Sequence, residues 1–247
     1  LWKCEKMIEV KDLTKEFNAV TALKVVSFQV NEGEVFAYLG PNGAGKTTTI
    51  NILVTLLTPT SGKSTVAGYD VTKNGMEVRR LIGYLPEDFG LYPSLNVYEN
   101  LDFAAGLYRI SKSERKERIR ELLEFFGLWE KRDVLASTLS KGMKQKVGIA
   151  RAMINDPKIL FLDEPTSGLD PGMAREVLKL ILRLKEEGKT ILMTTHLLAR
   201  AEQVCDSIAL INKGKILRTG KVSDIKAELK SPTLEDVYFS VMGENYE

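Results

Sequence analysis

A glycine-rich segment carries the clearest chemical signal in the sequence. It fits the pattern G-x-x-x-x-G-K-[ST], with apolar residues 35–39 before it and a helix-like segment, 48–57, after it. Between a strand and a helix, the backbone N–H groups of such a loop can point together at phosphate oxygens. This context favours a phosphate-binding loop over a chance glycine turn. The residues expected to bind phosphate are Gly40, Pro41, Asn42, Gly43, Ala44, Gly45, Lys46, Thr47 and Thr48.

Lys46 and Thr47 have separate predicted roles in that loop. The ammonium of Lys46 can neutralise the outer phosphates, and the hydroxyl of Thr47 can ligate Mg²⁺. Asp163 and Glu164 follow the apolar run 159–162, so they should lie at the carboxyl end of a buried strand, where ligands bind in open α/β sheets. We expect Asp163 to hold Mg²⁺ and Glu164 to act as general base on a water molecule. The alternative is that Asp163 caps a helix and Glu164 is a surface carboxylate.

Two further segments could meet the same phosphates. His196 is the only histidine and ends the expected strand 190–195, so it is either structural or placed to hydrogen-bond the terminal phosphate. Ser140 and Gly142 can open a helix whose free N–H groups bind an anion, and no acidic residue lies between Ser140 and Arg151. A plain helix cap is the alternative there, and composition does not identify the anion.

These motifs together resemble one family over nearly the whole chain. The phosphate loop, the segment Leu139–Met143, the strand ending at Asp163-Glu164, the loop Ser167–Asp170 and His196 follow one another as in the ATP-binding subunits of ABC transporters. The segments 91–95 and 233–237 are similar to the branch of drug, antibiotic and sodium exporters in which ATPase and permease are separate chains. The resemblance implies a single ABC ATPase domain over residues 1–247.

The resemblance also implies a fold and a dimer. The fold would be α/β, with a RecA-like phosphate-loop core, an N-terminal antiparallel β subdomain and an inserted helical subdomain over residues 89–155. Two copies would bind ATP and Mg²⁺ head to tail, so that one copy's signature residues close over the ATP held by Lys46 of the other. By this resemblance, the residues expected to close over the partner copy's ATP are Ser140, Lys141, Gly142, Met143 and Asp170. His196 is expected to sense the terminal phosphate.

Three residues depart from the family pattern, and one aromatic has two interpretations. Glu87 stands where most members have glutamine; it is expected near the nucleotide and Mg²⁺, where its charge would alter metal affinity. Lys141 and Met143 replace glycine and glutamine of the common signature. Phe17 matches the residue that stacks on adenine, or is an ordinary core aromatic.

Composition excludes several other classes of protein. The 247 residues carry 35 Lys and Arg against 33 Asp and Glu, a formal net charge of +2, which argues against a nucleic-acid partner. No segment has the roughly 20 apolar residues of a membrane span, so a separate multi-span permease is expected. The charged first ten residues do not resemble a signal peptide, and Cys4 and Cys205 form no pair motif. We expect a peripheral protein on the cytoplasmic face of the cell membrane.

The hydrophobic pattern predicts the elements that must position these residues. Residues 8–30 should form antiparallel strands, and the alternation of strands and helices after Lys158 predicts a parallel sheet with helices on both faces. Helices are expected after Ser111, with its capping-box spacing to Glu114, and after Asp170-Pro171, ending near Gly188. Two more are expected over 197–205 and 89–108. The second is rich in apolar residues and either joins the core or receives a permease helix.

Two rival functions remain at this point. A phosphate-loop kinase would need neither the Ser140–Gly142 signature nor the adjacent Glu164. An ABC ATPase that serves as a nucleotide-gated clamp outside transport would usually carry a coiled-coil arm or tandem cassettes, and this sequence has one cassette and no heptad arm. These residues do not specify the transported substrate or the direction of transport. They also do not distinguish a homodimer from a heterodimer.

Overall fold

Two β-sheets organise the fold in the computed structural model, which describes residues 6–243. The smaller sheet is antiparallel and has the order β2 (Val20–Asn31), β1 (Lys6–Phe17), β4 (Ser61–Val66) and β5 (Tyr69–Asp70). The larger has the order β10 (Lys215–Lys221), β9 (Ser207–Asn212), β3 (Val35–Leu39), β8 (Thr190–Thr195), β7 (Ile159–Asp163) and β6 (Ile82–Leu85). The predicted antiparallel N-terminal sheet and α/β core are confirmed.

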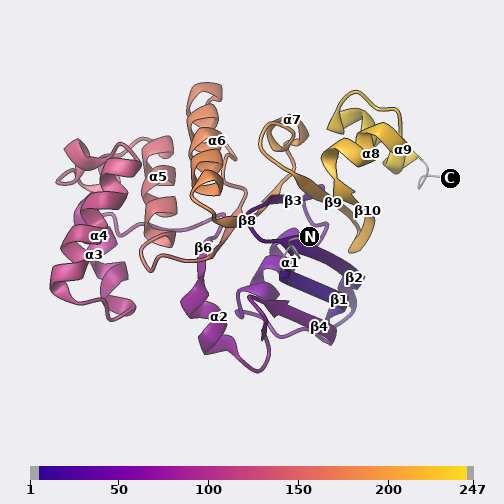
Figure 1. The fold of residues 1–247 in the computed structure, drawn as a ribbon, viewed down its shortest axis with the longest axis horizontal. Helices are drawn as coiled ribbons and strands as arrows, with labels where there is room; N and C mark the ends of the chain where they lie inside the picture. Colours follow the sequence, from indigo (N-terminus) through magenta and orange to yellow (C-terminus); the bar gives the residue numbers. More distant parts are fainter. Residues whose placement is uncertain (1–5, 244–247) are drawn as a thin grey trace, which may run out of the picture.

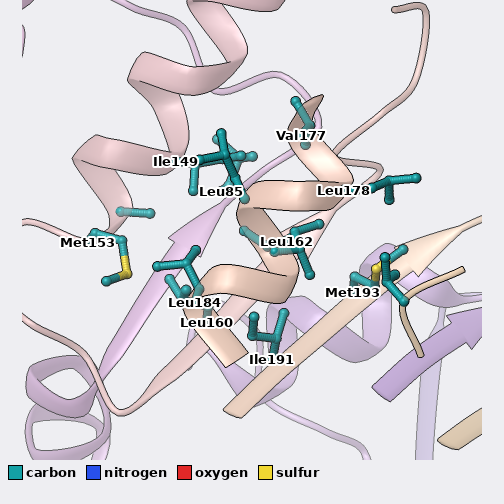
Figure 2. Packing of buried hydrophobic residues seen from close by; sticks show 14 of the residues in the cluster. Leu85, Ile149, Met153, Leu160, Leu162, Val177, Leu178, Leu184, Ile191 and Met193 are labelled. Carbon is teal, nitrogen blue, oxygen red and sulfur yellow. The ribbon is translucent and has the colours of Figure 1, made fainter. Parts of the chain in front are cut away.

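Helices cover both faces of the larger sheet, as predicted. Side chains of β3 alternate between two cores, with Phe36 and Tyr38 in one and Ala37 and Leu39 in the other. The first core packs against α1 (Lys46–Leu53) and the smaller sheet, and the second against α5 (Lys141–Ala152) and α6 (Pro171–Glu186) (Figures 1 and 2). A sheet buried on both faces holds the ends of its strands rigidly.

A cluster of helices forms one end of the molecule in Figure 1. It contains α3 (Val97–Leu107), α4 (Lys112–Phe125), the short 3₁₀ turns η1 (Trp129–Lys131) and η2 (Ala136–Thr138), and α5. The remaining helices are α2 (Gly75–Leu81), α7 (Leu198–Ala201), α8 (Val222–Glu228) and α9 (Leu234–Gly243). The division of the chain into a core and a helical part over 89–155 stays a prediction.

The predicted helix caps are confirmed. Ser111 and Glu114 form a reciprocal capping box at the start of α4. Asp170 accepts a hydrogen bond of 2.9 Å from the backbone N–H of Met173, and Pro171 is the first residue of α6. Gly188 has a φ of 82°, the left-handed conformation in which glycine commonly follows a helix end.

Several predicted elements are shorter or different. The segment 89–108 is helical only from Val97, because Asn96 and Glu99 form a capping box and residues before them form a loop. The helix predicted over 197–205 is reduced to α7, the helix predicted over 48–57 ends at Leu53, and β10 runs antiparallel to β9, so the larger sheet is mixed. Of the two cysteines, Cys4 lies outside the described residues, and Cys205 is free.

The apolar residues of 89–108 divide between core and surface. Val97 and Leu101 are fully buried, and the side chains of Phe89, Leu91 and Tyr98 pack against the core. Tyr92 and Phe103, by contrast, are 46% and 44% exposed, and their rings meet edge to face at 4.8 Å. The segment therefore contributes residues both to the core and to the surface, and docking of a permease helix on it stays a prediction.

Asn100 fixes the loop that precedes α3. Its side chain is fully buried, and its Oδ1 accepts a hydrogen bond of 2.9 Å from the backbone N–H of Tyr92. Its Nδ2 donates to the carbonyls of Tyr92 and Leu95, both at 3.2 Å, and of Asn96 at 2.9 Å. The side chain of Asn100 thus provides hydrogen-bond partners for backbone groups that, in a loop, have no partners from a helix or sheet.

Replacing Asn100 by alanine should therefore destabilise the protein. The loop's buried backbone groups would lose their partners, and the free energy of unfolding should fall by about 2–3 kcal/mol. Urea unfolding measures the change. Gln203→Ala, which removes an exposed amide, is the control and should change stability by no more than about 0.5 kcal/mol. Equal stability of the two variants would contradict the role given to Asn100.

Candidate active site

The phosphate loop joins the end of β3 to the start of α1, as the sequence predicts. Gly43 and Gly45 have φ values of 77° and 107°, which residues with a side chain rarely adopt. A Cβ atom on Gly45 would also lie 2.7 Å from the carbonyl oxygen of Ala22. Glycine is therefore required at position 45 by both backbone conformation and space.

Lys46 is buried and points back into the loop. Its Nζ donates hydrogen bonds to the carbonyls of Gly40 at 2.8 Å and Pro41 at 3.2 Å, and lies 3.4 Å from Oε1 of Glu164. Its charge is thus fixed inside the loop and already has an anionic partner. Thr47 is exposed at the start of α1.

Asp163 and Glu164 reach this place because β7 and β3 both pair with β8. Thr194 on β8 lies opposite Asp163, and its hydroxyl donates a hydrogen bond to Oδ1 of that residue. The backbone N–H of Glu164 donates to the carbonyl and to the hydroxyl of Thr194, at 3.2 and 3.1 Å. Glu164 has a φ of 49°, an uncommon conformation for a residue with a side chain, which these hydrogen bonds help to hold.

His196 contacts the same carboxylate. Its Nδ1 lies 3.0 Å from Oε1 of Glu164, so that single oxygen faces both Lys46 and His196. The other oxygen of Glu164, Oε2, and Oδ2 of Asp163 are buried and have no hydrogen-bond partner within the part of the chain described. Unpartnered buried carboxylate oxygens are costly unless a cation or a donor meets them. They are also the ligands that Mg²⁺ prefers, so this donor set fits that ion.

A hollow of about 230 Å³ opens beside these groups. Glu87 lines it together with the phosphate loop and Glu164, which places the glutamine-to-glutamate departure next to the candidate site. Burial and the charge of Asp163 raise the pKa of Tyr84, on the neighbouring strand β6, to about 12. The carboxylate field therefore extends to that strand.

The other predicted residues lie outside this hollow. Ser140 caps α5, accepting a hydrogen bond of 3.3 Å from the N–H of Met143, and both Ser140 and Lys141 are exposed, whereas Gly142 is buried against Met173. Among residues 6–243, no hydrogen bond or ion pair joins 140–143 to the phosphate loop. Asp170 caps α6, and Phe17 ends β1 with 44% of its surface exposed.

Sequence reasoning missed three residues that shape the site. Thr194 holds Asp163 and Glu164, and Ala22 crosses the phosphate loop from β2. Tyr238 of α9 lines a second hollow, of about 330 Å³, with Gly40, Pro41, Asn42 and His196. Thr194 could have been suspected, since two threonines follow the apolar residues 191–193 at the end of the strand. Ala22 and Tyr238 meet the site through contacts distant in sequence, which local patterns do not signal.

Comparisons with known proteins agree with this geometry. The family model described as ABC transporter matches residues 23–167. The chain is 40% identical over 243 residues to the probable multidrug ABC transporter ATP-binding protein YbhF of Escherichia coli, covering 96% of this chain and 42% of that protein. It is 35% identical to the linearmycin resistance ATP-binding protein LnrL of Bacillus subtilis, covering 97% of this chain and 77% of LnrL.

Solved structures show the same fold. An ATP-binding subunit of an ABC transporter has a TM-score of 0.85 and 36% identity, with 96% of this chain and 99% of that one covered. The ATP-binding cassette MJ0796, solved as a dimer in a post-hydrolysis state with ADP and Pi, has a TM-score of 0.78 and 32% identity, with 87% and 99% covered. Within residues 6–243, the helices are too short or too polar to cross a lipid bilayer.

Replacing Lys46 by alanine should weaken ATP binding. The variant loses a charge-assisted contact to phosphate of the kind that contributes about 1.5–3 kcal/mol, or roughly tenfold to a hundredfold in affinity. Titration calorimetry measures the dissociation constant, and circular dichroism checks the fold. Lys158→Ala, at the opposite end of β7, removes an exposed lysine and should bind ATP as the wild type does. Unchanged affinity in Lys46→Ala would contradict the assignment.

Proposed function

The chain belongs to the ABC transporter family, and we propose that it hydrolyses ATP to drive transport through a separate permease chain, most simply as export. The observation that supports hydrolysis best is the contact of one Glu164 oxygen with both Lys46 and His196 beside the phosphate loop. YbhF is a probable multidrug ABC transporter ATP-binding protein and LnrL a linearmycin resistance ATP-binding protein, and drug resistance is most directly conferred by export. We extend that direction to this chain, and with it a place on the cytoplasmic face of the membrane.

The proposal assigns each group a role toward ATP. Free backbone N–H groups of the phosphate loop and the Lys46 ammonium hold the phosphates. Phe17, 44% exposed and with its ring 4.9 Å from the Lys15 ammonium, offers a surface on which adenine can stack. Thr47, Asp163 and Glu87 would hold Mg²⁺. When bound, that ion stabilises the negative charge that develops on the phosphate oxygens.

Hydrolysis then depends on the freedom of Glu164. Phosphate oxygens at the loop compete with Glu164 for the Lys46 ammonium, which leaves the carboxylate of Glu164 available to accept a proton from water. His196, in contact with Glu164 and 39% exposed, can donate a hydrogen bond to the terminal phosphate. The attacking water would be oriented by Glu164 in line with the bond that breaks.

A second copy completes the site in this proposal. Ser140 is exposed at the start of α5, where the helix leaves backbone N–H groups free and the first turn holds no acidic residue. Ser140, Lys141, Gly142 and Met143 of one copy would close over ATP bound to the other, with Asp170 beside them. The cassette MJ0796 was solved as a dimer bound to ADP and Pi, which supports a dimer as the working unit in this proposal.

An apolar groove supports a docking site for the permease. It has a volume of about 300 Å³ and lies between the strand-bearing core and α3. Leu56, Tyr92, Phe103, Leu107 and Tyr108 line it, and each is at least 44% exposed. An apolar helix with side chains at i, i+3 and i+4 would bury this surface. The loop that forms one wall also carries Glu87, so the groove could respond to the nucleotide.

Replacing Glu164 by glutamine should separate binding from hydrolysis. The amide cannot accept the proton from water, so turnover should fall by about 10²–10⁴-fold. ATP should still bind, and because it persists, the variant should dimerise in ATP and Mg²⁺. Phosphate release measures turnover, and light scattering measures the dimer.

The control is Glu187→Gln, at the far end of α6, which should keep normal turnover. Near-normal turnover of Glu164→Gln would move the base to another residue, with His196 the first to be tested.

Replacing Tyr92 by aspartate should abolish assembly with the permease. A carboxylate at position 92 is costly to bury under an apolar helix, whereas the backbone hydrogen bonds of Tyr92 to Asn100 do not involve its ring. The chain would be co-expressed with the product of a neighbouring gene that encodes about six apolar spans of ~20 residues. Co-purification and transport should be lost, and ATP affinity kept.

Phe239→Asp is the matched control, because Phe239 is a 71% exposed aromatic on α9, outside the groove. Assembly and transport by Tyr92→Asp would show that the permease binds elsewhere, and an unfolded variant would show that the ring belongs to the core. A wild-type chain that never binds a membrane protein would favour the clamp function over transport.

A further inference from the structure

One loop touches both the phosphate hollow and the apolar groove. Residues 86–96 connect β6 to α3; Glu87, near their start, lines the hollow, and Tyr92 lines the groove. The position of Glu87 therefore depends on what holds the first half of this loop. The second half is held by Asn100, through backbone groups of residues 92–96.

Arg151, near the end of α5, holds the first half. Its Nη1 donates a hydrogen bond of 2.9 Å to the carbonyl of Gly90, and its Nη2 donates to the carbonyl of Phe89. Among residues 6–243, the ion pairs include none with Arg151, and burial lowers the pKa of its guanidinium. Two carbonyls thus solvate a largely desolvated cation, and hydrogen bonds of this charged kind are stronger than neutral ones.

The packing one turn earlier reinforces this attachment. A Cβ atom on Gly148 would lie 2.8 Å from the side chains of Leu85 and Phe89, so α5 approaches the loop as closely as a glycine allows. Arg151 is three residues further along the same helix, on the side that faces the loop. The loop from Leu85 to Gly90 is therefore seated on α5 at two successive points.

We propose that Arg151 is the positioning residue that sets the place of the Glu87 carboxylate in the phosphate hollow. This inference rests on the proposed function, because it treats that hollow as the site of ATP and Mg²⁺. Arg151 acts through the backbone of Phe89 and Gly90, two and three residues after Glu87, and does not itself line the hollow. The helix that carries it begins at the signature residues, about 15 Å away at 1.5 Å per residue.

Limited proteolysis tests the attachment in the protein without nucleotide. In Arg151→Gln, chymotrypsin should cleave after Phe89 about tenfold faster, because the segment 87–91 opens more easily. Cleavage after Leu95, in the part of the loop held by Asn100, should be as in the wild type. Arg175→Gln, which replaces an exposed arginine on α6, is the matched control. Equal cleavage after Phe89 in Arg151→Gln and the wild type would overturn the proposal.

A double-mutant cycle tests the link to Glu87. The Mg²⁺ concentration for half-maximal binding of fluorescent ATP should rise about threefold to tenfold in Arg151→Gln, and should not rise further when Glu87→Gln already removes the carboxylate charge. The same rise in both backgrounds, or none in the first, would overturn the inference. Arg151→Lys, which keeps the cation and one donor, should restore part of the affinity if Arg151→Gln is too unstable to measure.

The cycle also separates this inference from the proposed function. A wild-type chain that binds Mg²⁺ and ATP, with additive effects of the two substitutions, would overturn the role of Arg151 alone. A wild-type chain that binds neither would overturn both.

Discussion

The ion pair between Lys46 and Glu164 lies in the interior, and the larger sheet must keep it together. Both side chains are about 95% buried, and their charged atoms lie 3.4 Å apart. Removing two charges from water is costly unless geometry and further hydrogen bonds compensate, so small displacements matter. Lys46 follows β3 and Glu164 follows β7, with β8 between them, and the parallel register of these strands sets the distance. The hydrophobic faces of the sheet hold that register, because a slip of one residue would turn each apolar side chain to the opposite face.

Much of this arrangement could be predicted from short stretches of sequence. The glycines at positions 43 and 45 predict the backbone conformation of the phosphate loop. The four apolar residues before Asp163 predict a buried strand. The carboxyl ends of parallel strands share one edge of a sheet, so the phosphate loop, the acidic pair and His196 could be expected there together. The order of the strands could not be read, because it depends on crossovers. That order is what lets Glu164 contact both Lys46 and His196.

The predictions that were wrong share a physical cause. The segment 89–108 contains enough apolar residues for a helix, but its first part is held by side chains distant in sequence, Arg151 above all, and by Asn100. Local periodicity does not report such hydrogen bonds. The helix predicted over 197–205 shortens to α7 for a related reason. Residues just after His196 must leave the active edge, and Arg200 ties them to the carbonyl of Thr166, at 2.6 Å, in the loop after Glu164.

The contacts of Lys46 bear on how a site of this kind could switch. In this chain the ammonium is already satisfied by two carbonyls and one carboxylate, so this buried cation is paired before any phosphate binds. A phosphate at the loop offers Lys46 a more highly charged partner. Hydrogen bonds from the Lys46 ammonium to phosphate would therefore weaken its contact with Glu164. The second oxygen of Glu164 has no hydrogen-bond partner among residues 6–243. Thr194 holds the strained backbone of Glu164 and so keeps the carboxylate in place. Binding of phosphate would therefore take from the Glu164 carboxylate its contact with Lys46 and leave it free to meet a water molecule beside the phosphate.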